Sequence, residues 1–300
     1  MTDSAAQLLG RTEGRRYKRM ASHSPTRRLT NATATNFYYS FVFLPAEKRR
    51  AIEAVYHFAR RGDDITDGNL SPVDAAKAIA DYRAALDECV AGRGATPELQ
   101  TLAESIARFK IPRQPFDDLI LGLEMDLSGT KYATFEELAL YCYRVASTIG
   151  LISIEIFGYR NPSARDYGVN LGRALQMVNI LRDLESDARR GRLYLPQEDL
   201  DRFGIRPGEI REGRYSDPFI ELMQFECDRA RSYFDRAREL LAPEDRRSMV
   251  AAEIMGAIYW RVLGRIRERR YNVFGERVRL PRPLKFWTAL SVYLGFEWHT

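Results

Sequence analysis

The sequence is poor in the side chains that build disulfide frameworks and zinc sites. It has three cysteines, scattered without a CxxC spacing, and three histidines that lie too far apart to form a local metal motif. These absences argue against a disulfide-stapled fold and against a zinc site. Any metal ion that the protein uses is therefore expected to be a hard cation held by carboxylates.

Long hydrophobic runs and targeting segments are also missing. No stretch approaches the roughly 18 consecutive apolar residues of a membrane span, and residues 1–20 lack the apolar centre of a secretory signal. We therefore expect a cytoplasmic protein. Neither a nucleic-acid recognition motif nor a glycine-rich RNA-binding signature occurs, so no nucleic-acid partner is expected. With 45% hydrophobic and 29% charged residues, the chain has enough apolar material for a folded core.

Charge is unevenly distributed along the 300 residues, which carry a net charge of +5. Residues 1–30 hold seven Lys or Arg against two acidic residues, residues 261–285 hold nine against two, and the segment between them is acidic. Basic ends suit an anionic partner, either a phosphorylated substrate or a lipid surface. For residues 1–30, a flexible and solvated basic arm without a partner is an equal alternative. The folded domain is expected to span residues 31–300.

Proline spacing and apolar periodicity predict an all-α fold. The thirteen prolines are separated by intervals with the three-and-four spacing of amphipathic helices, and almost nothing has the pattern of a strand. Neither a fixed-period repeat nor a low-complexity linker interrupts the series, which favours a single helical domain. The predicted helices cover residues 46–67, 73–92, 97–109, 115–128, 134–158, 163–189, 218–241, 244–272 and 283–295.

One predicted helix carries an unusual polar face. Tyr56, Arg60, Asp63 and Asp67 recur at helical spacing over three turns. The two aspartates repel each other and Asp is a poor helix former, so local stability does not explain them. Carboxylates at this spacing can share Mg²⁺ ions, which prefer one or two carboxylates completed by water and substrate phosphate. The alternative is a charged, solvated helix end capped at Gly68.

A second helix repeats the acidic pair. Gln176, Asn179, Asp183 and Asp187 fall on one helical face among apolar neighbours, where polar side chains are costly unless they are mutually satisfied or bind a ligand. If the two helices face each other, their four aspartates form a cage for Mg²⁺. The ions would bridge to a diphosphate and neutralise its charge as it leaves.

The sequence resembles the squalene and phytoene synthases, the head-to-head branch of the isoprenoid synthases, over roughly residues 32–290. The segments that carry the resemblance are NFYYSFVFLP (Asn36–Pro45), YHFARRGDDITD (Tyr56–Asp67), YCYRVASTIG (Tyr141–Gly150) and NILRDLESDARRGRLYLPQEDL (Asn179–Leu200). The resemblance implies a single α-helical bundle around a central cavity, with aspartate-rich helices at its mouth. It also implies that two identical prenyl diphosphates are condensed with Mg²⁺, for which Mn²⁺ could substitute.

The same resemblance assigns roles to individual residues. Asp63, Asp67, Asp183 and Asp187 would bind the metal, and Arg60 and Arg182 would hold diphosphate oxygens. Departure of one diphosphate would leave an allylic cation, which the second substrate attacks to form a cyclopropylcarbinyl diphosphate in a dry cavity. Aromatic faces can stabilise such a cation, although core packing is a strong alternative for each aromatic residue. The remaining residues expected at the catalytic or substrate site are Phe37, Tyr56, Tyr141, Gln176, Asn179, Tyr194, Tyr259 and Arg277.

Details of the motifs look closest to the bacterial presqualene diphosphate synthases of squalene and hopanoid biosynthesis, which use two farnesyl diphosphates. Phytoene synthase, with two geranylgeranyl diphosphates, is the alternative. A non-catalytic helical scaffold of the same fold is a third reading, which the four retained aspartates disfavour. No glycine-rich dinucleotide fingerprint is present, so no nicotinamide cofactor is expected. The sequence leaves open whether the reaction stops at the cyclopropyl intermediate, and it leaves the oligomeric state open.

The last segment, residues 283–300, is rich in aromatic residues and follows the basic stretch of residues 261–285. Such a segment could dock on an anionic membrane, to which lipid-soluble products must be delivered. The alternative is a helix that closes the bundle.

Overall fold

The computed structural model describes residues 36–68, 70–296 and 298, and throughout this part the chain forms helices and no strands. The all-α prediction is therefore confirmed. The helices are α3 (Asn36–Phe41), α4 (Ala46–Thr66), α5 (Pro72–Val90), α6 (Pro97–Phe109), α7 (Gln114–Leu127), α8 (Phe135–Cys142), α9 (Thr148–Phe157), α10 (Ser163–Arg189), α11 (Gln197–Arg202), α12 (Pro207–Arg211), α13 (Asp217–Leu240), α14 (Val250–Glu268) and α15 (Arg282–Tyr293). The predicted basic arm of residues 1–30 lies outside the described residues.

Most of the long helices begin and end within two residues of their predicted bounds. Local signals explain this agreement. Ser71, Thr96 and Thr134 each accept a hydrogen bond from the backbone N–H three residues further on, and a proline follows the first two at the start of the helix. The short helices α3, α11 and α12 were not predicted, because five or six residues are too few to show a helical period.

The predicted helix at residues 244–272 is wrong at both ends. Residues 243–245 form a separate 3₁₀ turn, because the buried Asp245 carboxylate accepts the backbone N–H groups of Arg160 at 2.7 Å and Asn161 at 2.9 Å. At the other end, α14 stops at Glu268, and Arg270 and Tyr271 adopt positive φ angles of 51° and 65°. The spacing of apolar residues, from which the helix was predicted, does not indicate such tertiary contacts or backbone angles.

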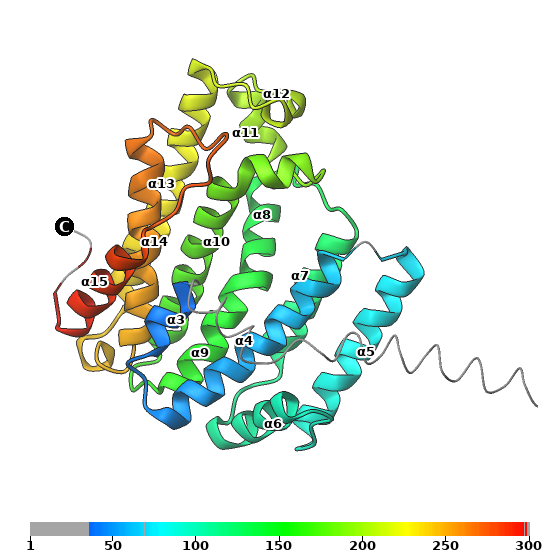
Figure 1. Ribbon diagram of the computed structural model, residues 1–300, viewed down its shortest axis with the longest axis vertical. Coiled ribbons are helices and arrows are strands. Elements are labelled where there is room, and N and C mark those ends of the chain that lie inside the picture. The colour runs from blue at the N-terminus through cyan, green and yellow to red at the C-terminus, as the bar shows by residue number, and fades with distance from the viewer. Residues whose placement is uncertain (1–35, 69, 297, 299–300) are drawn as a thin grey trace, which may run out of the picture.

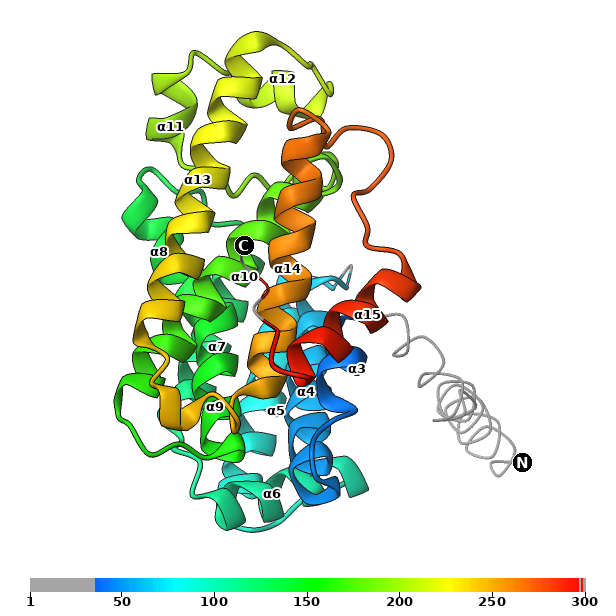
Figure 2. The same cartoon turned by 90° about the vertical axis from the view of Figure 1, so that its left-hand side faces the viewer.

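Helix α10 runs through the centre of the bundle (Figures 1 and 2). It packs along α13 on one side and along α9 on the other, while α4, α5 and α6 lie beyond α9 and α7. The close approach of α10 to residues 147–150 depends on glycine. A Cβ atom on Gly172 would lie 2.6 Å from the Cα atom of Ser147, and Gly150 and Gly168 meet in the same way one turn away.

The predicted helix at residues 134–158 contains a π turn, Tyr143–Ser147, between α8 and α9. In this turn the backbone N–H of Thr148 bonds to the carbonyl of Tyr143, five residues earlier. The π turn lies where Ser147 meets Gly172. It therefore shifts the register of the residues that α8 and α9 present to the interior.

One described helical stretch, Phe135–Phe157, is long and apolar enough to cross a membrane by length and composition alone. Half of its most apolar window is buried inside the protein. Its α9 part packs against α4, α7 and α10, as the core helix of a bundle does.

Candidate active site

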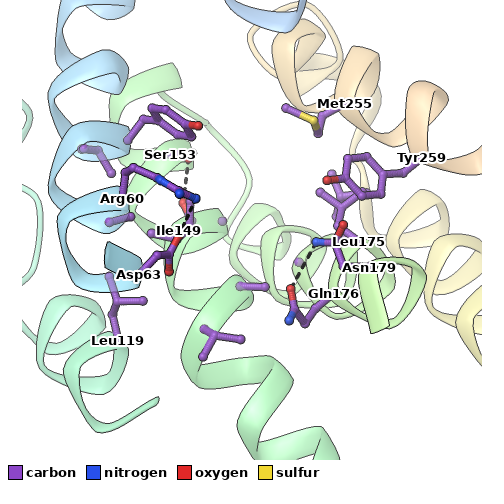
Figure 3. A pocket seen from close by; sticks show the side chains of 18 of the residues that line it. Arg60, Asp63, Leu119, Ile149, Ser153, Leu175, Gln176, Asn179, Met255 and Tyr259 are labelled. Carbon is purple, nitrogen blue, oxygen red and sulfur yellow. Dashed lines mark hydrogen bonds and ion pairs between the residues drawn. The ribbon is translucent and has the colours of Figure 1, made fainter. Parts of the chain in front are cut away.

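A cavity of about 460 Å³ lies between α4, α7, α9, α10 and α14, with Phe41 of α3 in its wall. This volume lies within the usual range for small-molecule sites. Its charged residues come from the C-terminal ends of α4, α7 and α10 and from the segment after α10, whereas its apolar residues come from earlier turns. The cavity therefore has a polar mouth and an apolar floor. Figure 3 shows Arg60 and Asp63 of α4 opposite Gln176 and Asn179 of α10, with Met255 and Tyr259 of α14 above the α10 residues.

The first aspartate pair lines the mouth from α4. Asp63 faces the cavity, and Arg60 lies 3.9 Å from its carboxylate and 3.3 Å from that of Asp64. The Asp63 side chain is 53% exposed, although it lies in the wall of the cavity. Burial raises the pKa of Asp63 to about 6, against the lowering effect of Arg60 and with a further raising effect from Asp67.

The second pair lines the opposite wall from α10, and its two members differ. Asp183 accepts bidentate hydrogen bonds from Arg182, at 3.0 and 2.5 Å, and from Arg277, both at 2.6 Å. Burial would raise the pKa of Asp183, but these two guanidinium groups outweigh it and hold the pKa below its ordinary value. For Asp187, burial and the nearby Asp183 raise the pKa to about 6, against Arg190 and Arg192. The charge of Asp183 is thus balanced by two arginines, while the charge of Asp187 is disfavoured by burial and by the nearby Asp183 and Asp67.

Arg192 joins the two sides of the mouth. It donates to the Asp67 carboxylate at 2.9 Å and to the carbonyl of Thr66 at 2.7 Å, across 125 residues of sequence. Arg190 and Arg192 both line the cavity. Neither was predicted as a site residue, although both stand in the segment Asn179–Leu200 that carries the family resemblance. Their position in that segment was the signal that could have identified them.

Asp126 of α7 is a further site residue that the sequence did not reveal. Its carboxylate accepts hydrogen bonds from Tyr141 at 3.1 Å and from Tyr194 at 2.9 Å, and the two rings stack with centroids 5.1 Å apart. Burial raises the pKa of Asp126, while the two tyrosine hydroxyls lower it. No local pattern singles out Asp126, because it belongs to neither acidic pair. The fold brings it together with Tyr141 and Tyr194, which were both predicted.

The remaining predicted residues lie in different surroundings. Tyr56 and Tyr259 line the cavity from α4 and α14. Gln176 and Asn179 also line it, and the Asn179 amide donates to Gln176 at 3.3 Å.

Two predictions are not placed in the cavity wall. Arg277 is not among the lining residues, and it lies at the mouth only through its ion pair with Asp183. The side chain of Phe37 lies outside what the structure describes.

The donor set fits Mg²⁺ shared with a phosphorylated ligand. Within the described residues, no three acidic, histidine or cysteine side chains gather into a ready metal cluster, so the four aspartates do not form a closed cage. All four nevertheless line one cavity. Mg²⁺ usually takes one or two carboxylates and completes its shell with water and phosphate oxygens. The metal-binding role of the aspartates therefore stays a prediction that this geometry accommodates.

Positive charge at the mouth complements a diphosphate. Arg60, Arg182, Arg190 and Arg192 all line the cavity. Lys285 of α15 is buried close by: burial lowers its pKa, and so do Arg182, Arg282, Arg279 and Arg277. The mouth thus combines carboxylates for a cation with guanidinium groups for an anion, above an apolar interior.

Comparisons with known proteins agree with this geometry. A family model described as squalene/phytoene synthase matches residues 30–283. A phytoene synthase of Arthrospira platensis is 35% identical over 278 residues, which cover 88% of this chain and 89% of that protein. A phytoene synthase of Mycobacterium tuberculosis is 38% identical over 258 residues, which cover 85% of each chain.

Two solved structures resemble the bundle closely. A dehydrosqualene synthase in complex with ligand superposes with a TM-score of 0.78 at 25% identity, covering 88% of this chain and 93% of that one. The squalene synthase HpnC from Alicyclobacillus acidocaldarius superposes with a TM-score of 0.73 at 30% identity, covering 82% and 93%.

Proposed function

Because the chain belongs to the squalene/phytoene synthase family of prenyltransferases, we propose that it condenses two identical prenyl diphosphates head to head, with C20 chains as in phytoene synthesis. The observation that carries this proposal is the convergence of two aspartate pairs and four arginines at the mouth of one apolar cavity. At the mouth, the carboxylates suit a cation and the guanidinium groups suit the diphosphate that it accompanies. The apolar floor suits a prenyl chain.

The residues of the mouth bind and orient the diphosphate groups. Asp63, Asp67, Asp183 and Asp187 would hold Mg²⁺, which as a Lewis acid would neutralise charge on the leaving diphosphate. Arg60 and Arg182 can each present a planar fork of N–H donors to phosphate oxygens. Because Arg182 and Arg277 both bond Asp183 in the free protein, ligand binding would have to exchange some of these bonds.

The apolar part of the cavity would protect the reactive cation. Loss of diphosphate leaves an allylic cation, and the double bond of the second substrate attacks it. Closure of the cyclopropane ring then releases a proton. Tyr141, which is hydrogen-bonded to Asp126, is positioned for a relay that ends on that carboxylate, and burial raises the pKa of Asp126. Tyr56 and Tyr259 offer ring faces to the developing positive charge.

The names of the relatives favour the C20 substrate. Several relatives at 33–38% identity are named phytoene synthases, so the expectation of presqualene diphosphate from two farnesyl diphosphates is not confirmed. The C15 reaction is the second candidate, because two of the similar solved structures are a dehydrosqualene synthase and a squalene synthase.

The test is a product assay with purified protein, Mg²⁺ and either C15 or C20 prenyl diphosphate. Organic-soluble products are identified by mass before and after phosphatase treatment, which separates a hydrocarbon from a cyclopropylcarbinyl diphosphate. We expect turnover of the C20 substrate. Turnover of only the C15 substrate would select the second candidate, and no turnover of either would favour a helical scaffold.

The site assignment has its own control. Asp63→Asn and Asp183→Asn are expected to abolish Mg²⁺-dependent turnover while far-ultraviolet circular dichroism stays helical. Asp81→Asn changes an exposed carboxylate on α5, away from the cavity, and should leave turnover unchanged. Near-normal turnover in both cavity variants would contradict the assigned roles.

A further inference from the structure

Helix α15 is apolar on both of its faces. It lies on the outside of α14 and α3, in red at the edge of the bundle in Figure 2. The inner face is buried through Thr288, Ala289 and Val292, together with the stem of Lys285. This face closes the bundle, as one of the two sequence-based alternatives expected. The opposite face of the same helix is largely exposed: Tyr293 stacks on Phe43, with ring centroids 4.3 Å apart, while Phe286 and Trp287 contact each other.

The exposed apolar side chains of α15 and of the turn that follows it, which we call the aromatic face, are Phe286, Trp287, Tyr293, Leu294 and Phe296. These side chains are 49–66% exposed. The first four fall on one side of the helix, because residues seven and eight positions apart lie two turns on along the same stripe. Soluble proteins rarely expose a contiguous apolar group of this kind unless it contacts a partner or a membrane. Aromatic side chains are typical of helices that lie in the membrane interface.

Positive charge borders the aromatic face. Arg282 precedes Phe286 by one helical turn and is exposed, as is Arg279 in the segment before the helix. No acidic residue occurs in α15, and residues 261–285 hold nine basic against two acidic side chains. This charge disfavours a basic or neutral partner and complements the negative surface of a bilayer with anionic lipids.

One layer of helices separates the aromatic face from the cavity. Phe41 of α3 and Met255 and Tyr259 of α14 line the cavity, and α15 packs on these two helices. Five residues before α15 begins, Arg277 pairs with Asp183 at the mouth. A bilayer in contact with α15 would therefore be separated from the cavity by about one layer of helices, roughly 10 Å thick.

From these observations we propose that α15 is an interfacial helix that docks the protein on an anionic lipid bilayer through its aromatic face. Phe286, Trp287, Leu294 and Phe296 would enter the boundary between headgroups and acyl chains, while Arg279 and Arg282 contact lipid phosphates. The proposal does not depend on catalysis, because it concerns a surface outside the cavity.

The experiment is vesicle flotation of the full chain, with phosphatidylcholine vesicles and with mixed phosphatidylcholine–phosphatidylglycerol vesicles. We expect co-flotation with the mixed vesicles that weakens as NaCl is raised, and little with phosphatidylcholine alone. The variant F286S/W287S should lower the partition coefficient by about tenfold or more, because two large apolar side chains are lost. The matched control is Val73→Ser on α5, a 79% exposed apolar residue away from α15, which should bind like the unaltered protein.

Trp287 supplies a second readout. Trp260 and Trp298 are partly or largely buried, so vesicle binding should shift the fluorescence of Trp287 alone to the blue, and Trp287→Phe should remove the shift while flotation persists. The proposal is overturned if the unaltered chain fails to float with anionic vesicles, or if F286S/W287S floats equally well. It is also overturned if sedimentation shows that the aromatic face joins two copies of the chain and F286S/W287S separates them.

Discussion

Replacing Asp187 with asparagine is expected to stabilise the metal-free protein above about pH 6 while weakening its response to Mg²⁺. The carboxylate is half-buried in the cavity wall, and burial together with Asp183 raises its pKa from 3.8 to about 6. Between these two values the folded state keeps the proton and the unfolded state has lost it. Stability therefore falls as the pH rises through this window and stays reduced above it. Asparagine carries no charge and avoids this loss.

The magnitude follows from the size of the shift. A change of roughly two pKa units corresponds to about 3 kcal/mol as an upper bound. Because the side chain keeps some contact with solvent, about 1–2 kcal/mol is the expected gain of Asp187→Asn near pH 8. For a chain of this size, that gain would raise the melting temperature by roughly 2–3 °C.

The assay is thermal unfolding in EDTA near pH 8 and near pH 5, followed by titration with Mg²⁺, with Asp183→Asn for comparison. Asp183 lies one turn away, but Arg182 and Arg277 hold its pKa below the ordinary value. Its carboxylate contributes stability above the unfolded pKa and loses it as the pH falls through the folded pKa, so Asp183→Asn should destabilise the protein by about 2 kcal/mol or more. Mg²⁺ should raise the melting temperature of the unaltered chain more than that of either variant.

Asp187→Asn and Asp183→Asn should thus shift stability in opposite directions near pH 8, and the gain of Asp187→Asn should shrink near pH 5. If Asp187→Asn is no more stable than the unaltered protein in EDTA near pH 8, the reasoning about repulsion and burial at the mouth is refuted.

Two further outcomes are expected. Mg²⁺ affinity, measured by calorimetry, should fall below pH 6 by about tenfold per pH unit for each of Asp63 and Asp187 that must first lose a proton, and a flat profile between pH 7 and 5 would contradict their role. Gly172→Ala places a methyl group against the backbone of Ser147, so urea unfolding should show a loss of about 1–3 kcal/mol in the free energy of unfolding. Unchanged stability would mean that α10 can move away from the π turn without cost.

The sequence by itself determined the helices and the two aspartate faces, because both depend on local spacing. A three-and-four apolar period with a capping residue and a proline defines a long helix within two residues, and side chains four apart fall on one face wherever the helix goes. The sequence also identified the family, because each of the four segments that carry the resemblance is continuous in the chain.

Only the tertiary structure decided which side chains pair with the aspartates. Arg192 reaches Asp67 across 125 residues, Arg277 reaches Asp183 across 94, and Tyr194 reaches Asp126 across 68. No periodicity records such pairs, because their distances depend on how the helices pack. The same packing helps to shift the pKa values of Asp183 and Asp187 in opposite directions although they share one helical face, since both are buried by other elements while distant Arg277 pairs with Asp183 and Asp67 faces Asp187.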